Sequence, residues 1–188
     1  MQKRITTFAI AICLILSGCN SLSTYPLEYY EVKAHGAPPQ MKARMISDHS
    51  SIRAGQTFKL GLFFSLQEGY YTYGAEKGKD NLPTDLNIKL PDGFSMIEES
   101  WPALKDKPGK TAAVNEKVYD SDFKVIYTIL APSVLAEEIL ILCSGNWQVC
   151  RAELCAMGGG EFELKLGTGR KKKSELFRLF QPTNQKSY

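Results

Sequence analysis

Two cysteines near the C-terminal end of the chain are the residues best able to do chemistry. Cys150 and Cys155 are separated by the four residues Arg-Ala-Glu-Leu. Such a pair can form a disulfide that closes a very small ring, and an accessible disulfide can exchange with the thiols of a second protein. The chain-entropy estimate for so small a ring is about 2 kcal/mol, at the low end of disulfide stabilisation. The spacing alone leaves both a redox pair and a structural bridge open.

Metal binding is the other chemistry open to these side chains. Zinc sites usually combine a C-x2-C pair with further cysteines or histidines nearby, and the only histidines, His35 and His49, are far from the pair in sequence. Copper(I) held by Cys150, Cys155 and Met157 is a minor alternative, because soft sulfur ligands select this ion. We expect the pair to work with no metal and no other cofactor.

The residues around the pair indicate how it is positioned. Trp147 and Val149 alternate just before Cys150, so Cys150 is expected at the end of a strand, with Cys155 across a turn. Neighbouring antiparallel strands come within disulfide reach. Cys143 precedes Cys150 by seven residues, an odd offset, so the two side chains would face opposite sides of a continuous strand. Cys143 is expected to be a buried, inert thiol.

The body of the chain is patterned as short β-strands. Apolar residues alternate strictly from Phe58 to Leu66, the strongest periodic signal in the sequence. Four more segments read as strands, namely Leu86–Leu90, Phe123–Ile129, Ile139–Cys143 and Phe162–Leu166, with Met41–Ile46 as a candidate first strand. Short strands separated by Gly, Pro and Asp turns predict an all-β sandwich. The stretches Gly69–Pro83 and Met96–Tyr119 are expected to be long loops, and long loops in compact domains often carry function.

The N-terminus is typical of a targeting signal rather than of a folded element. Two basic residues precede an apolar run of 12 residues, Ile5–Leu16, which suits a secretory signal. The following Leu-Ser-Gly-Cys ends at Cys19 and resembles a bacterial lipobox, which implies lipid attachment at Cys19. We therefore expect residues 1–18 to be a signal peptide, 19–40 a spacer, 41–168 a β-domain and 169–188 a basic tail. Asn20 after the anchor favours the outer membrane over the inner membrane.

Charge is unevenly distributed along the chain. Residues 1–18 contribute +2 and residues 170–188 contribute +5 to a net charge of +3, so the body between them carries −4. A mildly acidic body argues against nucleic acid as a partner. The basic cluster Arg170–Lys173 is expected to be part of a solvated tail, with contact to anionic lipid headgroups as the alternative.

Several motifs, in order, resemble the N-terminal periplasmic domain of the DsbD thiol:disulfide interchange proteins and the related disulfide-bond corrector family. The resemblance runs from about Met41 to Leu166. The matching segments are Gln67–Tyr73, Leu82–Thr84, Leu90–Phe94, Trp101-Pro102, Val118-Tyr119, and Asn146–Cys150 with Cys155. The resemblance implies an immunoglobulin-like sandwich with a redox pair, Cys150 and Cys155, at one end. It also implies that Trp101 caps the pair and that Tyr71 and Tyr73 line the site.

The partners that this resemblance implies are a membrane thiol reductase and thioredoxin-like periplasmic proteins, between which the pair passes electrons. No reductase or thioredoxin domain is attached within these 188 residues, so the electrons would come from a separate protein. The four-residue spacing lies between those of the two related families. The competing interpretation is an envelope lipoprotein that only binds a partner through its loops, with a disulfide that holds one loop.

Overall fold

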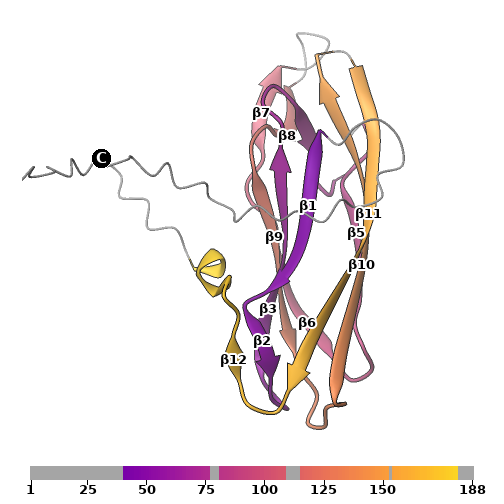
Figure 1. Ribbon diagram of the computed structural model, residues 1–188. Helices are drawn as coiled ribbons and strands as arrows, with labels where there is room; N and C mark the ends of the chain where they lie inside the picture. Colours follow the sequence, from indigo (N-terminus) through magenta and orange to yellow (C-terminus); the bar gives the residue numbers. More distant parts are fainter. Residues whose placement is uncertain (1–39, 77–80, 109–114, 153, 182–188) are drawn as a thin grey trace, which may run out of the picture.

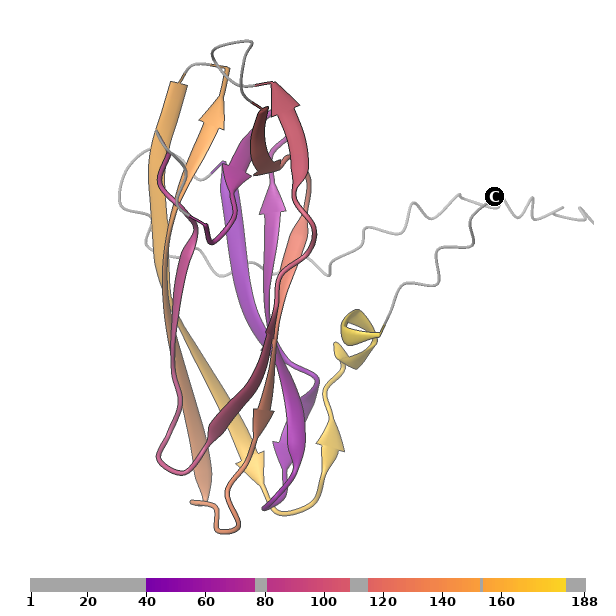
Figure 2. The same ribbon diagram turned by 180° about the vertical axis from the view of Figure 1, so that it is seen from behind.

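The computed structural model describes residues 40–76, 81–108, 115–152 and 154–181. Within these ranges the chain is an immunoglobulin-like β-sandwich with one short 3-10 helix, so the predicted fold class is confirmed. Figures 1 and 2 show an elongated molecule in which two long strands run from one end to the other. These are β10 (Glu138–Arg151) and β11 (Leu154–Thr168), which pair over fourteen positions and form the frame for the rest of the larger sheet.

The smaller sheet has four antiparallel strands in the order β1-β3-β9-β6. Their bounds are Met41–Ser47 (β1), Thr57–Leu66 (β3), Phe123–Leu130 (β9) and Ser95–Ser100 (β6). The alternation seen in the sequence sets the facing of β3, because Phe58, Leu60, Leu62 and Phe64 are almost fully buried and point towards the other sheet.

The larger sheet has the order β12-β2-β11-β10-β4-β8-β7, and β5 also pairs with β10. The additional strands are short: His49–Ile52 (β2), Tyr71–Tyr73 (β4), Asp85–Lys89 (β5), Lys105–Pro108 (β7), Asn115–Tyr119 (β8) and Lys172–Lys173 (β12). One edge of β10 is covered by β11. Its other edge is covered by β5 at Leu142–Asn146 and by β4 at Val149 and Cys150.

The main core lies between the sheets. Trp147 packs edge-on against Phe64, with ring centroids 5.7 Å apart. Gly158 lies opposite Trp147 in the β10–β11 pairing, and a Cβ at this position would fall 2.4 Å from Trp147 Nε1. Glycine at 158 therefore makes room for the indole ring. The strand β11 begins at Leu154 and runs through the glycines, whereas the sequence suggested a strand that starts only after them.

The prediction of two long loops is wrong in part, and mainly for the second stretch. The stretch Gly69–Pro83 contains β4, and Met96–Tyr119 contains most of β6 and all of β7 and β8. The side chains of β6 are all exposed and those of β7 are mostly exposed, so neither strand shows an alternation of apolar and polar residues. Pattern reasoning therefore has no signal for these strands.

The described part of the C-terminal segment packs on the sandwich, which contradicts the expectation of a solvated tail there. The 3-10 helix η1 (Phe177–Phe180) lies against the outer face of the smaller sheet, where Phe180 meets Phe63 at 5.6 Å between ring centroids. Ile46 belongs to the same buried cluster. Ser174 Oγ donates a hydrogen bond to the Ser47 carbonyl at 2.7 Å, which fixes the segment beside β1.

Candidate functional site

The β10–β11 hairpin holds the two candidate sulfurs in directly opposed positions. Cys150 pairs with Cys155 in the strand register, their Cα atoms are 4.0 Å apart, and the sulfurs form a disulfide. The hairpin turns at Ala152, whose φ of 51° lies in the left-handed region. A residue with a Cβ adopts this region at a cost of roughly 1–2 kcal/mol. The disulfide therefore closes the last turn of a hairpin that its own strand pairing already holds.

The disulfide lies on the outer face of the larger sheet. On β10 the side chains of Cys143, Trp147 and Val149 point into the sandwich, and the alternation places Cys150 on the opposite face. The predicted opposite facing of Cys143 and Cys150 is therefore confirmed. Burial raises the pKa of the Cys143 thiol to about 12, so this thiol stays protonated.

Two tyrosines cover Cys150 on this outer face. Tyr71 lies directly opposite Cys150 in the β4–β10 pairing, and Tyr73 follows on the same face. Together with Val118 of β8 they form a small buried cluster around Cys150, which has no exposed surface. The Tyr71 hydroxyl donates to the Ala152 carbonyl at 3.3 Å. The structure thus brings both predicted site-lining tyrosines to the sulfur pair.

Charged side chains from the neighbouring β7–β8 hairpin complete this cluster, and sequence reasoning missed them. The Lys107 ammonium lies 4.7 Å from the centre of the Tyr71 ring. The Tyr73 hydroxyl donates to a Glu116 carboxylate oxygen at 3.1 Å, and burial together with Tyr71 and Glu116 raises the Tyr73 pKa. The motif Val118-Tyr119 marked β8, but no pattern in the sequence indicated that β7 pairs with it.

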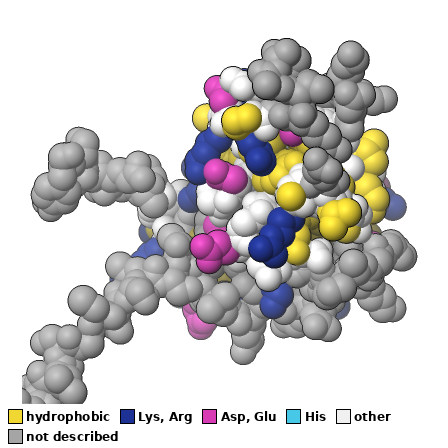
Figure 3. Space-filling model, turned by 90° about the horizontal axis from the view of Figure 1, so that it is seen from above, with side chains coloured by type: hydrophobic (Ala, Val, Ile, Leu, Met, Phe, Trp, Pro, Cys, Tyr) yellow, Lys and Arg dark blue, Asp and Glu magenta, His cyan; other side chains and the backbone are white. Residues whose placement is uncertain are grey.

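The second sulfur is on the surface. Cys155 is exposed, and so are its neighbours Leu154 and Met157, at 82% and 47%. Arg151 is exposed as well, and its guanidinium lies 5.4 Å from the Tyr70 ring centre. Viewed from this end of the sandwich, apolar and basic side chains lie next to one another (Figure 3). A thiol from solution or from another protein can reach Cys155, whereas Cys150 is closed off.

Two predicted site residues are placed elsewhere or lie outside the described part. Trp101 follows β6 of the smaller sheet, packs against the main core, and donates from its indole nitrogen to a Glu99 carboxylate oxygen at 2.6 Å. It is not part of the cluster around Cys150. Cys19 lies among residues 1–39, which the structure does not describe.

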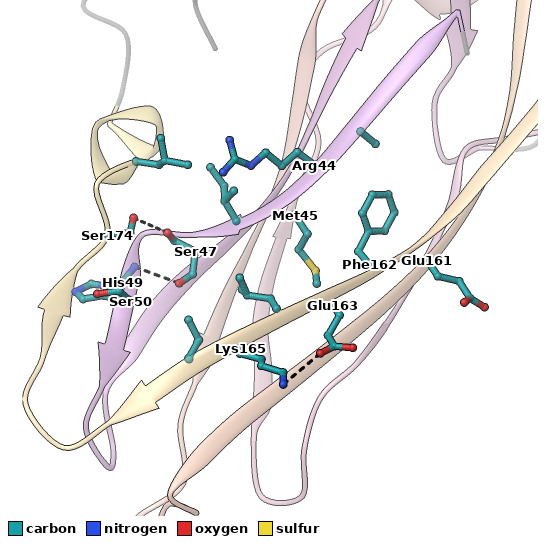
Figure 4. Close-up of a pocket in the computed structure, with 15 residues that line it drawn as sticks. Arg44, Met45, Ser47, His49, Ser50, Glu161, Phe162, Glu163, Lys165 and Ser174 are labelled. Atoms are coloured by element: carbon teal, nitrogen blue, oxygen red, sulfur yellow. Dashed lines mark hydrogen bonds and ion pairs between the residues drawn. The ribbon is translucent and has the colours of Figure 1, made fainter. Parts of the chain in front are cut away.

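A cavity of about 570 Å³ lies away from the sulfurs, between the edges of β1 and β11. Figure 4 shows Met45 and Phe162 beside it, with Lys165 and Glu163 paired on β11 and Ser174 bonded to Ser47 near β1. His49 is buried there, and its Nδ1 lies 2.7 Å from an Asp48 carboxylate oxygen. None of the cavity's lining residues belongs to the disulfide cluster.

No group of three or more His, Cys, Asp or Glu side chains among the described residues is arranged to hold a metal ion. Among the same residues, no helix has the length and apolar character needed to cross a membrane.

The family model for the N-terminal region of the thiol:disulfide interchange protein DsbD matches residues 40–166. This range agrees with the resemblance found from the motifs. No curated protein matched the chain.

The fold is similar to those of several solved structures. The reduced N-terminal domain of Neisseria meningitidis DsbD shares 15% identity, with 70% of this chain and 90% of that chain covered and a TM-score of 0.43. The N-terminal periplasmic domain of ScsB from Proteus mirabilis shares 16%, with 78% and 54% covered and a TM-score of 0.46. The complex of the DsbD and PilB N-terminal domains from Neisseria meningitidis shares 15% identity, with 63% of this chain and 86% of that chain covered and a TM-score of 0.35.

Proposed function

The chain belongs to the family of DsbD N-terminal domains of thiol:disulfide interchange proteins, and from this premise we propose that its Cys150–Cys155 disulfide is a redox-active pair. One observation carries the proposal. The bond joins an exposed cysteine, Cys155, to a fully buried one, Cys150, on the outer face of the sheet. A purely structural bridge has no need of that asymmetry, whereas an exchange reaction needs one sulfur open to attack.

The exchange begins at Cys155. A thiolate of a reduced partner attacks Cys155 Sγ, a mixed disulfide forms, and Cys150 leaves as a thiolate. The partner's second thiolate then attacks the partner's own sulfur in the mixed disulfide and releases Cys155. The partner becomes a disulfide, and the chain gains two electrons as a dithiol. The reverse sequence passes the electrons on to an oxidised protein.

The tyrosine cover gives Cys150 a defined role in this reaction. Tyr71, Tyr73 and Val118 exclude water and other thiols from Cys150. Attack at the wrong sulfur is therefore blocked, and the released Cys150 thiolate stays close to Cys155 for ring closure. Lys107, whose ammonium lies over the Tyr71 ring, is a cation of this cluster that would favour the thiolate, because a nearby positive charge lowers a thiol pKa. In this proposal the cover comes from the residues of β4, β7 and β8, and Trp101 supports the core.

The proposed partners are proteins with exchangeable thiols. A DsbD N-terminal domain from Neisseria meningitidis forms a complex with the PilB N-terminal domain. By analogy we propose that this chain receives electrons from a membrane thiol reductase and gives them to thioredoxin-like proteins in the periplasm. We also propose that Cys19 carries a lipid that holds the chain at the membrane, preferentially the outer membrane.

The reduction potential of the pair tests the central proposal. Equilibration with glutathione buffers, followed by thiol labelling, gives the potential directly. A working couple is expected above roughly −300 mV, whereas a value well below this would mark a structural bond and would favour the binding lipoprotein instead.

Single-cysteine variants test which sulfur is attacked. Cys150→Ala leaves the exposed Cys155 as a free thiol, which is expected to attack the disulfide of an oxidised thioredoxin-like protein and trap a mixed disulfide, while the partner's other sulfur leaves as a thiolate. Cys155→Ala leaves the covered Cys150 and is expected to trap little. Equal trapping by both variants would contradict the assigned order of attack, and trapping by neither would contradict exchange altogether.

The anchor is tested separately. Cells given labelled palmitate are expected to label the wild-type chain and not Cys19→Ser. Labelling of both chains would exclude Cys19 as the lipid site.

A further inference from the structure

Five cations lie around the C-terminal segment, away from the disulfide. We use "basic face" for Lys59, Lys124, Lys171, Lys173 and Arg178. Lys59, Lys171 and Lys173 line one recess of about 420 Å³. The Lys124 pKa is lowered mainly by burial and also by repulsion from Lys59, so these two side chains are neighbours as well. Lys124 and Arg178 line a second hollow, together with Lys105 and the carboxylates of Glu68, Asp120 and Asp122.

The basic face is fixed to the sandwich. Phe180 and Leu179 pack with Phe63 and Ile46 on the outer face of the smaller sheet. The Lys124 ammonium donates to the Leu179 carbonyl at 2.7 Å, and the Lys173 ammonium lies 3.8 Å from the Phe177 ring centre. The charges of the basic face are therefore held at fixed positions.

The cations of the basic face are not neutralised within the described residues. No ion pair there joins any of the five to a carboxylate. The one buried carboxylate at the first recess, Asp48, accepts hydrogen bonds from the Lys59 backbone N–H and from His49 Nδ1. In the second hollow Asp120 pairs with Lys105, and on β7 and β8 Lys117 pairs with Asp106. The excess positive charge therefore lies at the first recess, where three lysines surround one buried carboxylate.

We propose that the basic face docks on the anionic headgroups of a phospholipid bilayer. The phosphates of an anionic membrane complement a fixed cluster of unpaired cations, and each basic residue near such a surface adds attraction. The recess between Lys59, Lys171 and Lys173 offers room for a headgroup phosphate. The lipid anchor proposed at Cys19 would already hold the chain at a membrane, so docking would only have to orient it. The proposal does not depend on the disulfide being redox-active.

Lysine reactivity on vesicles tests the proposal. The intact chain is reconstituted in vesicles of phosphatidylcholine alone or of phosphatidylcholine with phosphatidylglycerol, and each lysine is followed by acylation and mass spectrometry. Phosphatidylglycerol is expected to slow the modification of Lys59, Lys171 and Lys173 several-fold. Lys89 and Lys165 are exposed on the larger sheet and serve as internal controls that keep their rates. High salt is expected to remove the protection, because it screens charges at exposed surfaces.

Matched variants sharpen the test. K171Q/K173Q is expected to weaken docking about 30-fold, equivalent to about 1 kcal/mol for each basic residue, and so to abolish the protection of Lys59. K89Q/K165Q is expected to leave that protection unchanged. Equal lysine rates in the two vesicle types would overturn the proposal. So would protection that appears without phosphatidylglycerol and grows with protein concentration, which indicates self-association, or protection given only by soluble polyglutamate, which indicates an acidic protein partner.

Discussion

The two faces of one strand, β10, give its cysteines opposite properties. Cys143 points into the core between the sheets, and burial raises its pKa to about 12. Cys150 lies seven residues later on the outer face, bonded to the exposed Cys155 and covered by two tyrosines. The backbone is continuous between them. The difference in chemistry therefore comes from what each face contacts.

This contrast separates stability from exchange within a single strand. The inner face of β10 packs against β3 and β9 in the main core, whereas the outer face near Cys150 contacts a small cluster from β4 and β8. Substitutions on the inner face should thus lower the free energy of unfolding and leave thiol exchange intact. Substitutions at the sulfur pair should abolish thiol exchange and lower the free energy of unfolding less. Four predictions test this separation.

The largest expected loss of stability is on the inner face. Trp147 is 3% exposed and packs against Phe64, so Trp147→Ala should lower the free energy of unfolding by about 3–5 kcal/mol. The measurement is urea unfolding followed by fluorescence and circular dichroism. At temperatures where the variant is folded, its reduction potential should equal that of the wild type. A shifted potential would mean that the two faces are coupled.

The sulfur pair should contribute less to stability. The double variant Cys150→Ala, Cys155→Ala should lose all exchange with a dithiol and only about 2 kcal/mol of unfolding free energy, because the ring is small. The fourteen paired positions of β10 and β11 remain to hold the hairpin. Cys143→Ala is the matched control, and it should exchange at the wild-type rate. A loss above that of Trp147→Ala would make the disulfide a structural staple.

The inner face of the sandwich was largely predictable from the sequence. Strict alternation at Phe58–Leu66 and Phe123–Ile129 located two central strands, and the odd offset between Cys143 and Cys150 gave their opposite facing. These features follow from the two-residue period of a strand with one buried side. The tyrosines at the site came from the family motifs, since alternation alone cannot name a partner strand.

The surroundings of the disulfide were less predictable, for physical reasons. The strand β7, Lys-Asp-Lys-Pro, has no apolar side chain to mark it except its terminal Pro108, so Lys107 could not be placed beside Tyr71. Trp101 has the large aromatic side chain expected of a cap, but it follows β6 of the smaller sheet and therefore packs against the main core. The sequence predicted a basic tail at the C-terminus because charged residues dominate its composition. The burial of Phe180 could not be predicted, since it depends on contact with Phe63 on the outer face of β3.

A smaller effect is expected at the link between the two faces. Thr72 is fully buried on β4, between the two site tyrosines, and its hydroxyl donates to the Gln148 carbonyl at 2.8 Å. Thr72→Val removes this bond and should cost about 1–2 kcal/mol. The alkylation rate of Cys150 in the reduced protein should rise, because β4 carries the cover. Thr72→Ser restores a donor and should restore slow alkylation. An unchanged alkylation rate in Thr72→Val would show that the tyrosines hold their place without this bond.

The smallest predicted effect concerns the pH dependence that Cys143 imposes. The folded state raises the Cys143 pKa from 9.0 to about 12, so it holds the proton more tightly than the unfolded chain does. The stability gained in this way is complete below pH 9 and is lost as the pH rises towards 12, by about 1 kcal/mol between pH 9 and pH 10. Tyr119, whose pKa is raised to about 12, adds a similar loss above pH 10.

The readout is therefore the difference between the wild type and Cys143→Ala in unfolding free energy, measured at both pH values. The wild type should lose about 1 kcal/mol more than the variant over this interval. Equal losses would mean that the Cys143 thiol ionises as readily in the folded chain as in the unfolded one. In that case water reaches the inner face of β10, and the separation between a closed thiol and an exchanging pair on the same strand does not hold.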